Sequence, residues 1–81
     1  MAVPDLKDKM KEYLEARFEG KASGLFLSRI GTIIDKMPDN PSAMGEGLNN
    51  VRIAVKLLFD DTLSDDIYEE LRLMAKYPDR V

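Results

Sequence analysis

The apolar residues of this 81-residue chain recur with the period of an α-helix in four successive stretches, and this recurrence most constrains the fold. Glycine, proline and aspartate separate the stretches at short intervals. The pattern predicts helices over about residues 4–19, 23–37, 41–59 and 64–77. Because short connections favour antiparallel neighbours, we expect an all-α fold, a compact antiparallel four-helix bundle.

Local signals at the helix ends support these boundaries. Gly20 is placed to end the first helix, and Ser23, Asn40 and Ser64 are the residue types that cap helix N-termini. The length allows one hydrophobic core, and a hydrophobic fraction of 44% with 33% charged residues is typical of globular chains. We therefore expect residues 1–81 to form a single helical domain.

The apolar stripe of each expected helix predicts the core. The inward residues are expected to be Leu6, Met10, Tyr13, Leu14 and Phe18; Phe26, Ile30, Ile33, Ile34 and Met37; Met44, Leu48, Val51, Val55, Leu58 and Phe59; and Ile67, Leu71 and Met74. The tripeptide at positions 45–47 begins like a dinucleotide-binding motif, but Asn50 replaces the third glycine and no strand precedes it. Its glycines are better interpreted as residues that either allow close packing or loosen the first turn of a helix.

The absence of histidine and cysteine excludes much catalytic chemistry. The chain cannot form a Ser-His-Asp triad, a thiolate zinc site or a disulfide. The remaining carboxylate, lysine, tyrosine and serine groups show no spacing that selects a reaction. We therefore expect no enzyme, no catalytic residues, no cofactor and no dedicated metal site.

Six acidic residues gather within eleven positions around the start of the fourth expected helix: Asp60, Asp61, Asp65, Asp66, Glu69 and Glu70. This cluster would suit a basic partner or hold a divalent cation weakly. Acidic residues near a helix N-terminus also favour the helix dipole and keep the surface soluble. The sequence leaves these interpretations open.

Several large apolar residues lie off the predicted stripes. Ile53 and Leu57 fall opposite the inward face of the third helix, and Leu73 and Tyr77 are displaced from that of the fourth, as is Leu25 in the second. Together they would form an exposed patch for a partner helix or a homodimer. Alternatively, the third helix is buried on two sides and Ile53 and Leu57 belong to the core.

Charge and hydropathy limit the partners. A net charge of −3 argues against binding nucleic acid, and no run approaches the ~20 apolar residues of a membrane span. The first nine residues lack the apolar stretch of a signal peptide, so we expect a cytoplasmic location. No stretch matches a family motif specific enough to assign functional residues.

These observations favour a small cytoplasmic protein–protein interaction or regulatory module, bacterial in type and non-enzymatic. Its partner is expected to be an unknown protein or a second copy of the chain. The candidate partner-binding residues are Ile53, Leu57, Leu73, Tyr77, Asp65, Asp66, Glu69 and Glu70. One alternative is an acidic immunity- or antitoxin-like inhibitor that occupies a basic site on its partner. Another is a weak carboxylate metal-binding protein.

Overall fold

Four α-helices and one short 3-10 helix make up the computed structural model, which describes residues 3–38 and 40–77. The elements are α1 (Val3–Arg17), α2 (Gly24–Asp35), η1 (Pro41–Ala43), α3 (Gly45–Leu58) and α4 (Asp61–Lys76). The part of the chain that the structure describes contains no strand. The predicted all-α four-helix fold is confirmed.

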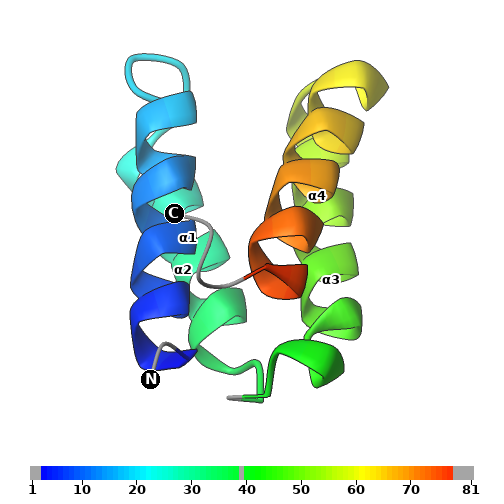
Figure 1. The fold of residues 1–81 in the computed structure, drawn as a ribbon. Helices are drawn as coiled ribbons and strands as arrows, with labels where there is room; N and C mark the ends of the chain where they lie inside the picture. The colour runs from blue at the N-terminus through cyan, green and yellow to red at the C-terminus, as the bar shows by residue number, and fades with distance from the viewer. Residues whose placement is uncertain (1–2, 39, 78–81) are drawn as a thin grey trace.

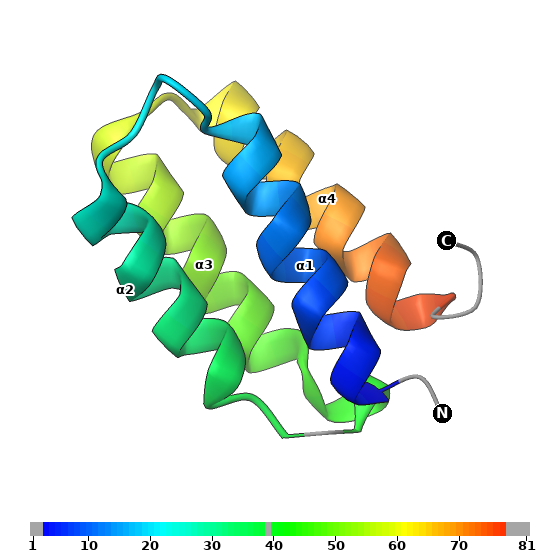
Figure 2. The same cartoon turned by 90° about the vertical axis from the view of Figure 1, so that its left-hand side faces the viewer.

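Successive helices run in alternate directions, as the colour gradient in Figure 1 shows. α1 packs against α2 and α4, and α3 packs against the same two helices, so the four helices surround one core. Figures 1 and 2 place the α1–α2 and α3–α4 connections at one end of the bundle, which we call the loop end. The α2–α3 connection lies at the opposite end.

The core contains nearly all the residues that the helical stripes predict. The buried apolar residues are Leu6, Met10, Leu14, Phe18, Phe26, Ile30, Ile34, Met37, Met44, Leu48, Val51, Val55, Ile67, Leu71, Met74 and Ala75. Tyr13, Ile33 and Phe59 pack against this core while partly buried. The prediction for Leu58 is wrong, since it is 65% exposed. Leu58 is the last residue of α3, and the next residue, Phe59, covers the end of the core instead.

Three aromatic rings close the core at the loop end. The centroid of the Phe18 ring lies 5.4 Å from that of Phe26 and 5.1 Å from that of Phe59, and the Phe26 and Phe59 centroids are 5.7 Å apart. These separations fall within the favourable range for aromatic pairs. The cluster therefore ties α1 and α2 to the end of α3.

The helix starts confirm one predicted cap and correct another. The hydroxyl of Ser23 accepts a hydrogen bond from the backbone N–H of Phe26, as expected of an N-cap. Ser64 is not a cap: it is fully buried inside α4, and its hydroxyl donates to the carbonyl of Asp61 at 2.9 Å. α4 begins earlier, where the Asp60 carboxylate accepts from the N–H of Leu63 at 2.7 Å.

The predicted helix over residues 41–59 is divided. Asn40 accepts a hydrogen bond from the backbone N–H of Ser42 at 3.1 Å, but the turn that it caps is η1 rather than the long helix. α3 then begins at Gly45 without a side-chain cap. Met44, which lies between η1 and α3, is fully buried in the core as predicted.

Replacing Asp60 by alanine should lower the free energy of unfolding by about 1 kcal/mol, because the N-terminal N–H groups of α4 lose their side-chain acceptor. Urea denaturation followed by far-UV circular dichroism measures this loss. Asp60→Asn keeps the acceptor oxygen and should recover most of the stability. Equal losses from the two variants would contradict the assigned cap.

Candidate functional site

Four large apolar side chains are exposed on α2 and α3. The exposed fractions are 74% for Leu25, 48% for Ile53, 79% for Leu57 and 65% for Leu58. Leu25 directly precedes Phe26, and Leu58 directly precedes Phe59. Because the Phe26 and Phe59 rings are in contact, these two leucines lie at the same end of the bundle. We call Leu25, Ile53, Leu57 and Leu58 the α2–α3 patch.

Helix geometry explains why α3 contributes to this patch. Val51 and Val55 point into the core and are fully buried. Ile53 and Leu57 are four residues apart, so they share one face of α3, opposite that core face. α4 engages α3 through other residues, including Arg52, whose Nε donates to Asp65 at 3.0 Å. Ile53 and Leu57 therefore lie on the surface, and the alternative that placed them in the core is wrong.

Leu73 and Tyr77 do not join the patch. Leu73 is partly buried in α4, and Tyr77 is the C-cap of that helix, with 48% of its surface exposed. α4 starts at the loop end and runs away from it, so Tyr77 lies at the opposite end from Leu57 (Figure 1). The Lys76 ammonium lies 5.5 Å from the centroid of the Tyr77 ring. The expectation of one patch that contains Leu25, Ile53, Leu57, Leu73 and Tyr77 is therefore wrong, because antiparallel packing separates the helix ends that carry them.

Two residues of the patch were not among the predicted site residues. Leu58 was predicted to lie in the core, and Leu25 was predicted to lie off the stripe of its helix but was not among the candidate partner-binding residues. Helical period alone gives the direction in which each side chain points. Their proximity arises from the contact between Phe26 and Phe59, two residues far apart in the sequence.

The acidic residues of α4 point in several directions. Asp65 accepts from Arg52 of α3, and Asp61 lies 3.8 Å from the Lys56 ammonium, also on α3. Glu69 pairs with Arg72 of its own helix at 2.7 Å, and this hydrogen bond lowers the pKa of the Glu69 carboxyl. The predicted acidic cluster is therefore dispersed in part among intramolecular ion pairs.

Asp66 and Glu70 of α4 lie close enough to α1 for their charges to affect Tyr13. Burial raises the pKa of the Tyr13 hydroxyl, and the negative charges of Glu70 and Asp66 raise it further. Within residues 3–38 and 40–77, no group of three or more acidic side chains is arranged to hold a metal ion. The described acidic side chains thus contribute negative surface charge but do not gather into one binding site.

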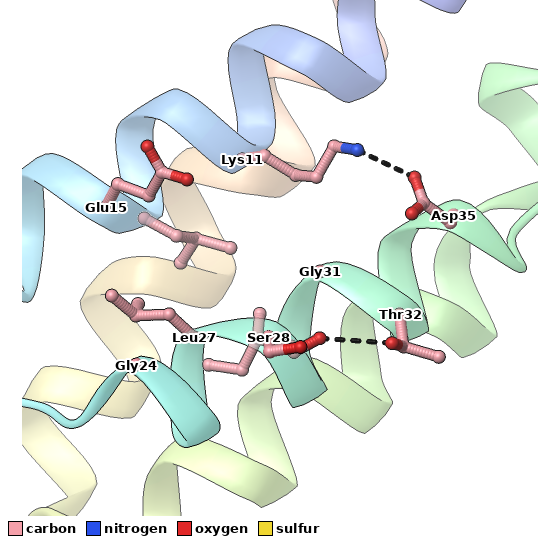
Figure 3. Close-up of a pocket in the computed structure, with 10 residues that line it drawn as sticks. Lys11, Glu15, Gly24, Leu27, Ser28, Gly31, Thr32 and Asp35 are labelled. Carbon is pink, nitrogen blue, oxygen red and sulfur yellow. Dashed lines mark hydrogen bonds and ion pairs between the residues drawn. The ribbon is translucent and has the colours of Figure 1, made fainter.

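A groove of about 490 Å³ lies between α1 and α2 (Figure 3). The Lys11 ammonium spans it to reach the Asp35 carboxylate at 2.8 Å, and this hydrogen bond raises the pKa of Lys11. The Thr32 hydroxyl donates to the backbone carbonyl of Ser28 within α2. Among the described residues, no buried side-chain oxygen or nitrogen lacks a hydrogen-bond partner.

Comparisons of the chain with protein-family models, with curated proteins and with solved structures found no match. Across the described ranges, no helix has both the length and the apolar character that crossing a bilayer requires. The function of the chain must therefore be inferred from its own surface.

Proposed function

We propose that this chain is a small, non-enzymatic interaction module that binds a protein surface through the α2–α3 patch. The exposure of the patch is the observation that carries the proposal. Leu25 and Leu57 are both more than 70% exposed, and neither belongs to the hydrophobic core cluster. Exposed apolar residues that gather at one place typically mark a binding site, and Leu25, Leu57 and Leu58 share one end of the bundle. The proposed location remains cytoplasmic.

Burying the patch would supply a useful binding free energy. Removing a leucine or isoleucine side chain fully from water contributes about 1.5–3 kcal/mol. Ile53 and Leu57 form an i, i+4 pair on a helix, which suits packing against a helix or a flat apolar surface. The association should therefore persist at raised salt.

The two alternatives have less support. An acidic inhibitor needs carboxylates that are available to a basic partner, whereas Asp65 and Glu69 already accept from Arg52 and Arg72 of the same chain. A carboxylate metal site needs convergent ligands, and the described acidic residues do not converge. The proposed function therefore depends on the α2–α3 patch.

Photo-cross-linking in the cells that express this chain tests the proposal. A photoreactive amino acid at position 57 should yield discrete cross-linked products, while the same residue at position 12 should not. Glu12 is a matched control because it is an exposed helical residue on α1, which does not border the patch. The products at position 57 should persist in lysates adjusted to about 0.5 M salt before irradiation.

Substitution provides the second arm of the test. Leu57→Asp with Leu58→Asp should abolish the cross-links formed from a photoreactive residue at position 53, while the helical circular dichroism spectrum stays unchanged. Identical products from positions 12 and 57, or none from position 57, would show that the patch is not a binding surface.

A further inference from the structure

We propose that the occupant of the α2–α3 patch is a second copy of this chain, related to the first by a two-fold axis parallel to α3. This inference rests on the proposed function, because it names the partner of the same patch. The apolar residues and the charges on either side of them support it independently.

In a two-fold symmetric dimer, each patch residue occurs twice in the interface, once from each copy. In such a contact the same surface of both copies is buried, so Leu57 near the axis meets Leu57 of the second copy. Leu25 and Leu58 are exposed at the same end of the bundle as Leu57, so they lie near this contact. Four exposed side chains form a small contact, and interfaces below about 1,200 Å² of total buried area are weak and transient. We therefore expect a reversible, concentration-dependent dimer.

The flank of the patch on α2 is basic. Arg29 lies four residues after Leu25, so both residues occupy the same face of α2. The Arg29 side chain is exposed and forms no ion pair with any residue in the described ranges. A free guanidinium beside an exposed leucine is suited to an acidic residue on a partner.

The opposite flank carries the Asp61 carboxylate of α4, which lies beside the Lys56 ammonium of α3. The Asp61 side chain is 73% exposed, and its contact with the Lys56 ammonium is long, at 3.8 Å. Arg29 follows Phe26 by three residues, and Lys56 precedes Phe59 by three residues. Because α2 and α3 are antiparallel and Phe26 contacts Phe59, Arg29, Lys56 and Asp61 lie at similar heights along the bundle.

Because Arg29 and Asp61 lie at similar heights along the bundle, two possible directions of the two-fold axis can be distinguished. A two-fold axis parallel to α3 exchanges the flanks, so α2 of each copy lies on the side of α4 of the other and Arg29 approaches the partner's Asp61. An axis perpendicular to α3 within the same interface would set α2 against α2, so Arg29 of one copy would lie on the side of Arg29 of the other and away from its Asp61. Charge complementarity therefore favours the parallel axis, with both patches at the same end of the dimer.

Light scattering of the purified chain over a concentration series up to about 1 mM tests the proposal. The wild type should move from the 9.2 kDa mass of one chain toward twice that mass. Arg29→Glu and Asp61→Lys should each raise the dissociation constant about tenfold or more, because each places two like-charged pairs in the dimer. Glu12→Lys changes an exposed charge away from the patch and should have no effect.

Mixing the two charge variants gives the sharpest result. In the flank-exchanged dimer, a heterodimer of Arg29→Glu with Asp61→Lys keeps one native pair of Arg29 with Asp61. At its other contact the two substituted side chains meet, with glutamate on one copy facing lysine on the other, so mixing should restore association. Circular dichroism must show that both variants are helical. A mixture that stays monomeric, or a wild-type dimer unaffected by Arg29→Glu, would overturn the proposed arrangement.

The test also separates this inference from the proposed function. If the purified chain stays monomeric throughout the series while position 57 cross-links to a polypeptide of another mass, the dimer is wrong and the interaction module stands. If position 57 forms no specific cross-link and the chain stays monomeric, both proposals are wrong.

Discussion

Phe18→Ala is expected to leave the chain largely unfolded at 25 °C. The Phe18 side chain is fully buried and contacts the rings of both Phe26 and Phe59, so its removal opens a cavity where three helices meet. Replacing a buried phenylalanine by alanine costs about 3–5 kcal/mol. A core of this size typically provides a net stability of about 3–5 kcal/mol, so the loss equals most of the total. Far-UV circular dichroism at 25 °C and urea denaturation measure it.

Two variants make this result specific to the core. Phe18→Leu retains most of the apolar volume and should remain folded with a lower urea midpoint. Leu57→Ala truncates an apolar side chain that is 79% exposed and should change the free energy of unfolding by no more than about 0.5 kcal/mol. A Phe18→Ala protein with a midpoint close to that of the wild type would show that the aromatic cluster does not anchor the loop end.

The helical period predicts the core because it records which side of each helix avoids water. Phe18, Ile34 and Met44 lie on predicted stripes, and all three are fully buried. Ser23 was predicted as an N-cap from residue type alone, and its hydroxyl forms the expected hydrogen bond. Such features depend on residues within one or two turns of each other, so a single sequence contains them.

Features that depend on how far neighbouring helices extend were not predictable in this way. Leu58 has the correct angle for the core, but it ends α3, and Phe59 covers the core in its place. The N-cap of α4 is Asp60 rather than Ser64, because Ser64 is buried within the helix and Asp60 is free to accept from Leu63. In both cases tertiary packing decides between local signals of similar strength.

The composition of the candidate site depended on contacts distant in sequence. Leu57 and Tyr77 both lie off their helical stripes, yet only Leu57 lies at the loop end with Leu25. The pairing of Arg52 with Asp65 joins two helices across thirteen residues, and it removes one carboxylate from the predicted acidic cluster. Periodicity identifies exposed residues, whereas topology determines which of them meet.

Gly47→Ala should lower the free energy of unfolding by about 1–3 kcal/mol, although alanine normally favours a helix. A Cβ atom at Gly47 would overlap the side chain of Met37, which is only 5% exposed and has little space to move. The glycine therefore permits α3 to approach the end of α2, which confirms its interpretation as a packing residue. Thermal and urea denaturation both measure the loss.

Gly31→Ala is the matched control, and its effect should have the opposite sign. Gly31 lies inside α2, where a Cβ atom would meet Lys11 Cδ at 3.6 Å, an ordinary van der Waals distance. Alanine should therefore raise the free energy of unfolding by about 0.5–1 kcal/mol through its greater helix propensity. Since both changes add the same methyl group to a helical glycine, the difference between them isolates the contact with Met37. A gain of stability in both variants would mean that the α2–α3 packing relaxes freely around position 47.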